Sequence, residues 1–251
     1  MRLGALLGPM LPNASATFLA EQSRTFAGEG FESLWSVQAI GRGFVMSDPF
    51  VALSVAASVT DKTEIGTAVI QLPLYHPVDL AHRVFSLMQI CGERFQFGVG
   101  AGSTQKDFDS FGRDYPSRFK TFAASLAQLQ QVFADGRLGD VDLSPWPSVR
   151  GGPPLLLGAW GGTGVERAAK SYAGWIASAA NRSAADVVSA LGRFRRAGGR
   201  RAIVSTIQIG ASTDLCKTQD LLAQFAAAGF DDAVVMLMPG GPTAAAVRRL
   251  I

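Results

Sequence analysis

The stretch that decides the fold runs from Glu64 to Gly102 and reads EIGTAVIQLPLYHPVDLAHRVFSLMQICGERFQFGVGAG. Its first part, Glu64–Ile70, is a short β-branched run that predicts a strand. Apolar residues recur at helical spacing from Pro77 to Ile90, and Phe95–Val99 predicts a second buried strand. A strand, a helix and a strand within about forty residues indicate a βαβ unit with parallel strands, whose ligand sites lie just beyond the C-terminal strand ends.

The same alternation of strand and helix continues along the whole chain. The predicted strands are Arg2–Leu7, Ser33–Val37, Glu64–Ile70, Phe95–Val99, Leu155–Leu157, Trp175–Ala177, Ala202–Ile209 and Asp232–Leu237. With 251 residues and 48% hydrophobic content, the chain matches the usual length of one eight-stranded barrel. We therefore predict an α/β protein with a single (β/α)8 TIM barrel domain over residues 1–251. An open doubly wound sheet is the competing architecture, but the glycines after the first strand lack the G-x-G-x-x-G spacing typical of it.

Two segments are predicted to depart from the repeating pattern. The connection from Gly100 to Pro116 is long, polar and charged, and long loops in compact domains are usually functional or disordered. The segment from Gly136 to Pro154 is rich in proline and glycine, which favours an excursion outside the barrel.

The first residues allow two interpretations. Arg2, the apolar run Leu3–Leu11 and Ala14-Ser15-Ala16 imitate a signal peptide with its cleavage site. Glycines and prolines interrupt that run, and a first barrel strand that ends in Gly8-Pro9 explains the same residues. We favour the strand, and two distant cysteines without C-x-x-C spacing further favour a reducing, cytoplasmic location.

Composition argues against several classes of ligand. The net charge is only +3, and the arginine cluster at Arg193–Arg201 is explained by a helix C-terminus, where cations are stabilised. A single aromatic residue, Phe194, stands among those arginines, without the repeated interleaving of a single-strand platform, so we predict no nucleic-acid binding. No apolar run is long enough to predict membrane association, and His76 and His82, the only histidines, would not share a helix face, so no metal site is expected.

Glycines mark two strand ends where a ligand can approach the backbone. Gly98, Gly100 and Gly102 alternate after the fourth predicted strand, which allows a flat ring or a phosphate to come close, although a tight turn explains them as well. The segment GAWGGTG, residues 158–164, follows the fifth predicted strand and leads into a helix. Free N–H groups and the positive end of the helix dipole make such a helix start a phosphate site, with a flexible loop as the alternative.

Three motifs in order resemble the bacterial luciferase-like monooxygenase superfamily of (β/α)8 barrels, which use FMN or coenzyme F420: IGTAVIQLPLYHPV (65–78), GERFQFGVGAG (92–102) and KDFDSFGRDYPSR (106–118). The resemblance implies a non-proline cis peptide at Ala68–Val69 that backs the flavin or deazaflavin ring. It also implies that Arg118 binds the cofactor phosphate, although a surface ion pair would explain that arginine too. The remaining cofactor-binding residues predicted with this family context are Gly100, Gly102, Trp160, Gly161, Gly162 and Thr163.

The chain departs from the family pattern at two positions. Many members carry a histidine just after the second strand, where this chain has Gln38-Ala39, and F420-dependent sugar-phosphate dehydrogenases carry a glutamate where this chain has Ser103. The catalytic residues are therefore left unassigned.

The resemblance implies an FMN-dependent monooxygenase that acts on a small organic substrate with O2. An F420-dependent oxidoreductase that transfers hydride, and a non-catalytic flavin-binding protein on the same fold, remain open alternatives. The family also implies a homodimer and a separate flavin reductase that supplies reduced flavin.

Overall fold

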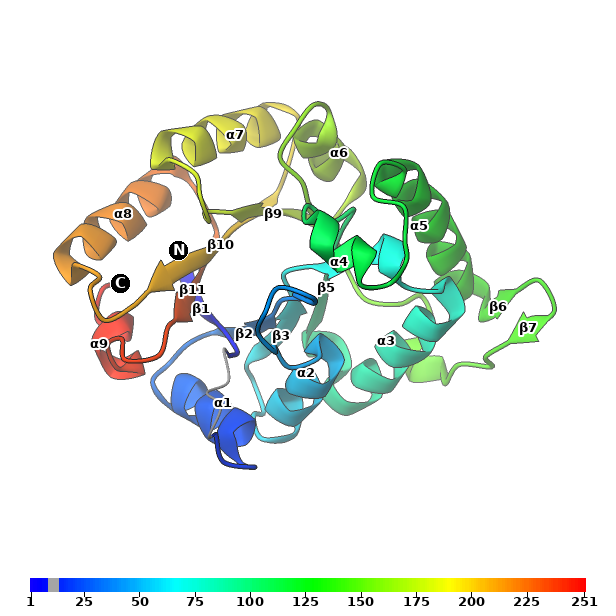
Figure 1. Ribbon diagram of the computed structural model, residues 1–251, viewed down its shortest axis with the longest axis horizontal. Coiled ribbons are helices and arrows are strands. Elements are labelled where there is room, and N and C mark those ends of the chain that lie inside the picture. The colour runs from blue at the N-terminus through cyan, green and yellow to red at the C-terminus, as the bar shows by residue number, and fades with distance from the viewer. Residues whose placement is uncertain (9–13) are drawn as a thin grey trace.

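The computed structural model describes residues 1–8 and 14–251, and its centre is a closed barrel of parallel strands (Figure 1). Strand β11 pairs with β1, and β3 pairs with β5, so the sheet closes on itself. Around the ring the strands are β1 (Arg2–Leu6), β2 (Ser33–Ser36), β3 (Glu64–Thr67), β5 (Phe95–Gly100), β8 (Leu155–Gly158), β9 (Gly174–Ser178), β10 (Arg201–Ile209) and β11 (Asp232–Leu237). The predicted (β/α)8 barrel is confirmed, and the open sheet is wrong.

Strand β1 confirms that the first residues form a barrel strand, with Leu3, Ala5 and Leu6 fully buried. Burial of these side chains on both faces is typical of a parallel sheet covered by helices. The later part of the apolar run, including Pro9 and Leu11, lies outside the described residues.

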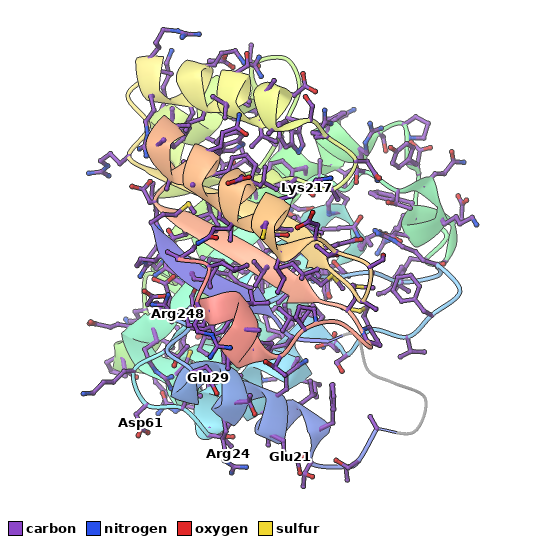
Figure 2. All side chains as sticks on the ribbon, turned by 90° about the vertical axis from the view of Figure 1, so that its left-hand side faces the viewer. Glu21, Arg24, Glu29, Asp61, Lys217 and Arg248 are labelled. Carbon is purple, nitrogen blue, oxygen red and sulfur yellow. The ribbon has the colours of Figure 1, made fainter. Side chains whose placement is uncertain are left out.

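Helices surround the strands and return the chain from the end of one strand to the start of the next. They are α1 (Phe18–Gly28), α2 (Pro49–Ser58), α3 (Pro77–Cys91), α5 (Arg118–Asp135), α6 (Gly164–Ser171), α7 (Ala184–Arg196), α8 (Leu215–Ala228) and α9 (Ala244–Arg248). Charged side chains such as Arg24 and Lys217 point away from the barrel (Figure 2). Arg248 of α9 donates a hydrogen bond to the carbonyl of Gly30 at 3.0 Å, which joins the last helix to the loop that follows the first. In the described part of the chain, no helix is both long and apolar enough to cross a membrane.

Two hydrophobic clusters hold this arrangement together. The larger one lies mainly between strands and helices, and a small one, which includes Leu6, Trp35, Leu156, Ile176, Ile203 and Val234, fills the inside of the barrel. Trp35 fits there because Gly66 lacks a side chain: a Cβ atom at Gly66 would lie 2.3 Å from the Trp35 ring. At the N-terminal strand ends, Arg201 binds Glu64 at 2.6 Å and the fully buried Asp232 at 2.9 Å.

The third strand was predicted as one continuous segment, Glu64–Ile70. In the structure it is divided, with a cis peptide between Ala68 and Val69. The chain then resumes as β4 (Ile70–Gln71) and the 3-10 turn η1 (Leu72–Leu74). Gly66 pairs with Gln96 and Ile70 with Val99, so three residues of this strand face two residues of β5. The interruption is a β-bulge at the C-terminal end of the strand, and it carries the cis bond that the resemblance implied.

Both segments predicted to depart from the pattern do so. The connection after β5 contains the short helix α4 (Gln105–Asp109). Between α5 and β8, the antiparallel hairpin of β6 (Arg137–Leu138) and β7 (Val141–Asp142) projects from the barrel (Figure 1) and is followed by η3 (Pro147–Val149). A further 3-10 turn, η2 (Gly92–Arg94), joins α3 to β5. Only the connection after β5 reaches the site described next.

Candidate functional site

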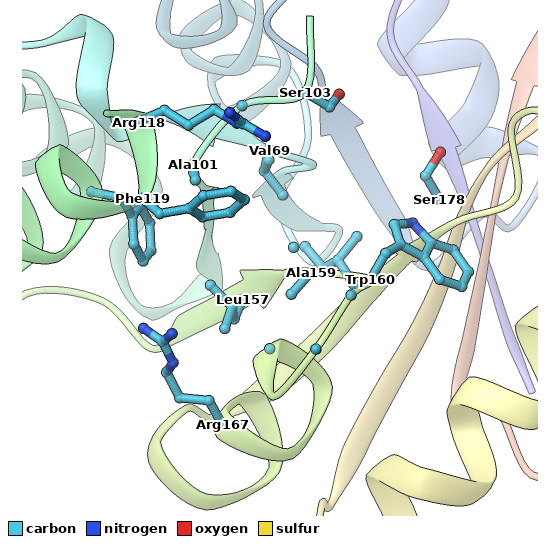
Figure 3. A pocket seen from close by; sticks show the side chains of 18 of the residues that line it. Val69, Ala101, Ser103, Arg118, Phe119, Leu157, Ala159, Trp160, Arg167 and Ser178 are labelled. Carbon is cyan, nitrogen blue, oxygen red and sulfur yellow. The ribbon is translucent and has the colours of Figure 1, made fainter. Parts of the chain in front are cut away.

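A cavity of about 660 Å³ opens at the C-terminal strand ends, where a (β/α)8 barrel places its active site (Figure 3). The bulge after β3, the ends of β5, β8 and β9, the start of α5 and the first turn of α6 all contribute to its lining. All nine residues predicted to bind a cofactor line it: Ala68, Val69, Gly100, Gly102, Arg118, Trp160, Gly161, Gly162 and Thr163. Residues that are up to 95 positions apart (68 to 163) thus meet in one place.

One wall of the cavity is Val69, the second residue of the cis bond. A Cβ atom on Gly100 would lie 3.0 Å from Val69 Cγ2, and one on Gly158 would lie 2.9 Å from Val69 Cγ1. A Cβ atom on Gly98 would lie 1.9 Å from the Thr67 carbonyl oxygen. A side chain at these glycines would collide with the bulge or with Val69. The glycines are therefore required by the packing of the bulge, in addition to the predicted approach of a ligand to their backbone.

Arg118 begins helix α5 and has its guanidinium held between aromatic rings. Its Cζ lies 3.9 Å from the ring centroid of Tyr115 and 4.3 Å from that of Phe119, and Nη1 donates to the Tyr115 carbonyl at 3.1 Å. Its Nε is buried without a hydrogen-bond partner, and within the described residues no carboxylate pairs with it. The surface ion pair considered from the sequence is therefore wrong, and the guanidinium keeps a fixed orientation and an uncompensated charge.

The glycine-rich loop after β8 leads into helix α6. In its first turn, the Gly164 N–H donates to the Gly161 carbonyl at 3.0 Å and the Arg167 N–H to the Thr163 carbonyl at 2.9 Å, which leaves the N–H groups of Val165 and Glu166 as donors. Thr163 is the N-cap residue, and its hydroxyl makes no capping hydrogen bond. Cβ atoms placed on Gly161 or Gly162 would meet nothing within 4 Å, so the loop is open next to the cavity. The donors and the hydroxyl fit an anion such as a phosphate.

The charge of the lining is positive. Among the described residues, it contains Arg118, Arg167 and Arg182 but no aspartate, glutamate or histidine. Figure 3 shows Arg118 and Arg167 on one side of the cavity and Trp160 with Ser178 on the other. Sequence reasoning missed Arg167 and Arg182, although each follows a predicted strand end closely enough that a longer scan of those loops would have included it.

The two positions that depart from the family pattern have different surroundings. Gln38 is 3% exposed and lies outside the lining: its Oε1 accepts from the Gln71 amide at 2.9 Å, and its Nε2 donates to the Tyr75 hydroxyl at 3.1 Å. Burial raises the pKa of Tyr75 to about 12. Gln38 therefore ties β2 to β4, whereas Ser103 does line the cavity.

A buried carboxylate extends this network toward the barrel mouth. Asp107 of α4 is fully buried, and it accepts from Gln71 Nε2 at 2.5 Å and from Arg42 Nε at 2.8 Å. Arg42 belongs to the loop after β2. The network thus fixes α4 and that loop beside the bulge.

The histidines and cysteines lie apart from the cavity lining. His76 caps α3, since its Nδ1 accepts from the Val78 amide at 3.3 Å, and His82 is exposed. Cys91 and Cys216 are free. Within residues 1–8 and 14–251, no group of three or more histidine, cysteine or acidic side chains is placed to bind a metal ion.

Sequence comparison places this geometry among known proteins. The family model for luciferase-like monooxygenases matches residues 4–236. A 4-hydroxyprotoasukamycin monooxygenase from Streptomyces nodosus subsp. asukaensis is 33% identical over 135 residues, which is 51% of this chain and 36% of that protein. The chain thus matches well under half the length of that relative.

Solved structures agree in fold. The monooxygenase RslO1 from Streptomyces bottropensis has a TM-score of 0.81 at 18% identity, over 100% of this chain and 97% of that chain. An F420-dependent secondary alcohol dehydrogenase, in complex with an F420-acetone adduct, has a TM-score of 0.78 at 14% identity and covers 100% and 98%. The oxygenating constituent of 3,6-diketocamphane monooxygenase from Pseudomonas putida, in complex with FMN, has a TM-score of 0.68 at 18% identity and covers 89% and 71%.

Proposed function

Because the chain belongs to the luciferase-like monooxygenase family, we propose that it is an FMN-dependent monooxygenase that acts on a small organic substrate with O2. The observation that carries this proposal is the convergence in one cavity of a bulged strand wall, a partly buried guanidinium without a carboxylate partner and an open glycine loop at a helix start. A flat ring with a phosphorylated tail needs these three features together: a surface for the ring, a cation and backbone donors for the phosphate.

The residues present fit that group. The unpartnered Nε of Arg118 is a donor that protein atoms leave unused, and burying a donor without a partner costs about 1–3 kcal/mol. A phosphate at this side of the cavity would also balance the guanidinium charge, with which no carboxylate of the described residues pairs. Gly161 and Gly162 leave open space at the helix start, which a larger side chain would take from the phosphate.

Each part of the lining has a role in this function. Arg118, Arg167 and the N–H groups at the start of α6 bind the phosphate, and Val69 supports one face of the ring. Leu157, Ile176 and Phe122 are apolar lining residues that keep water from the ring. When bound, reduced FMN supplies the activation of O2, which no side chain of the lining could provide.

The test is an absorbance titration of the purified protein with FMN and, separately, with F420. FMN should bind, and Arg118→Ala should weaken its binding by about 1–3 kcal/mol, as expected for one charge-assisted contact. Arg196→Ala, on the exposed face of α7, is the matched control and should leave the affinity unchanged.

The other outcomes separate the alternatives. Binding of F420 alone would replace the proposal with the hydride-transferring oxidoreductase, whose fold is shared by the F420-dependent dehydrogenase described above. Tight FMN binding without oxidation of any compound in a panel of aldehydes, ketones and phenols would favour a non-catalytic flavin-binding protein. Binding of neither cofactor would refute all three. The homodimer and the separate flavin reductase stay predictions.

A further inference from the structure

Arg182 follows strand β9 and stacks on Trp160. Its Cζ lies 4.2 Å from the Trp160 ring centroid. Trp160 is itself well anchored, with an edge-to-face contact to the buried Trp175 at 5.9 Å and a carbonyl that accepts from Arg193 Nη2 at 3.2 Å. Arg182 thus rests on a rigid platform, and rigid placement lowers the entropy lost when a side chain binds a ligand.

The guanidinium of Arg182 has its donors free. In the part of the chain that the structure describes, it makes neither an ion pair nor a hydrogen bond, and no carboxylate lines the cavity. Stacking on an aromatic ring uses only the face of a guanidinium and leaves the in-plane N–H groups available, in a geometry that suits a carboxylate. Arg182 is an exposed residue, so these N–H groups can exchange water for an anionic ligand.

That anion is different from the one at Arg118. Figure 3 shows Trp160, on which Arg182 stacks, across the cavity from Arg118 and Arg167. A phosphate bound by Arg118, Arg167 and the start of α6 would leave Arg182 without a partner. Its N–H groups are then available to a second anionic group, carried by the substrate.

Hydroxyl groups gather on the same side. Ser178 lies near Trp160 in Figure 3, and Ser205 of β10 also lines the cavity. Next to Ser205, the pairing of β10 with β11 shifts register between Val204 and Ile207, and Thr206 has a φ of 63°. A β-branched residue in the left-handed region is rare and is found preferentially at functional sites. These hydroxyls supply neutral hydrogen-bonding groups beside the cation.

We propose that Arg182, stacked on Trp160, binds the carboxylate of the substrate, so that the enzyme acts on small organic acids. This inference rests on the proposed function, because it places the substrate in the cavity beside the cofactor. Arg182 acts here as a specificity-determining residue and takes no part in the chemical step.

The experiment compares acids with neutral analogues of the same shape by isothermal titration calorimetry. The probes are 4-hydroxybenzoate with 4-hydroxybenzamide and octanoate with octanamide, titrated into FMN-saturated and into cofactor-free protein. In the wild type, at least one acid should bind about tenfold or more tightly than its amide, which is the effect of one charge-assisted contact. Arg182→Gln should remove that preference, Arg182→Lys should keep part of it, and Arg196→Gln, an exposed arginine of α7, should change nothing.

Separate measurements distinguish the failure of this inference from failure of the proposed function. FMN affinity should be unchanged in Arg182→Gln. Equal binding of acids and amides to the wild type, or an acid preference that survives in Arg182→Gln, overturns the inference. A loss of FMN or F420 affinity in Arg182→Gln with unchanged acid preference assigns Arg182 to the cofactor instead. If neither cofactor binds, the proposed function fails, while the titrations of cofactor-free protein still decide whether Arg182 selects carboxylates.

Discussion

Replacement of Gly98 by alanine tests how tightly the strands fit behind the cavity. The added Cβ atom would lie 1.9 Å from the Thr67 carbonyl oxygen and 2.7 Å from Ile176 Cδ1. An ordinary C···O contact is about 3.3 Å or longer, so Thr67 or Gly98 must move by more than about 1 Å. Neither residue is free to do so, because Thr67 Oγ1 donates to the Gly98 carbonyl at 2.8 Å and the barrel is closed on both sides.

The cost follows from these contacts. Overpacking costs about 1–3 kcal/mol, and loss of the Thr67 hydrogen bond adds about 1 kcal/mol. We therefore expect Gly98→Ala to lower the free energy of unfolding by about 2–4 kcal/mol. Tryptophan fluorescence during urea unfolding measures this directly, since Trp35 and Trp175 are buried.

The matched control is Gly28→Ala at the exposed end of α1, where a Cβ atom would meet nothing within 4 Å. It should leave the protein as stable as the wild type or up to about 1 kcal/mol more stable, because alanine has a higher helix propensity than glycine. If Gly98→Ala unfolds within about 0.5 kcal/mol of the wild type, a scale typical of surface changes, the strand packing described here is wrong.

Three further changes test other parts of the molecule. Asp107→Asn removes the carboxylate that pairs with Arg42 and should lower the free energy of unfolding by about 2–3 kcal/mol, as measured by denaturant unfolding. The loss is smaller than for a fully buried ion pair because the Arg42 side chain is 31% exposed. Burial raises the pKa of Tyr75 from 10.0 to about 12, so the folded state holds this proton more tightly than the unfolded state. Stability should therefore fall as the pH rises from 10 toward 12, and Tyr75→Phe should show a smaller fall in unfolding midpoint over that range. Arg167→Gln should weaken FMN binding about three- to tenfold, measured by quenching of flavin fluorescence, with thermal stability unchanged.

The strands were predictable because each is a compact apolar run between turn signals. Leu155–Leu157 and Asp232–Leu237 are largely buried in the barrel and have no amphipathic pattern that could be mistaken for a surface helix. The break in the third strand is different. Apolar periodicity continues through Ala68 and Val69, so only the family resemblance pointed to a cis bond, and nothing in the run itself indicates that one extra residue faces β5.

The site was predictable where backbone requirements decide it. The glycines at 161 and 162 predict an open loop from composition alone. The position of Arg118 was predicted from the motif KDFDSFGRDYPSR. Arg182 was not found because it lies beyond the strand end that was scanned, in the loop after β9, and Ser205 was not found because its direction depends on the phase of β10. The bulge in β10 changes which side chains point inward after Val204, and such a shift leaves no signal in composition.

The two halves of the barrel mouth therefore differ in how their polar side chains are used. On the side of β2 to β5, Gln38, Gln71 and Asp107 form one hydrogen-bonded chain. At Gln38, where the resemblance led us to expect a histidine, an amide joins β2 to β4 instead. On the side of β8 to β10, Arg182 and the hydroxyls keep unused capacity for ligands. The described lining contains no histidine or carboxylate, so under the proposed function we expect this chain to bind and orient its ligands and to exclude water. Selection of the substrate then falls to the half of the mouth with free donors, which is where Arg182 lies.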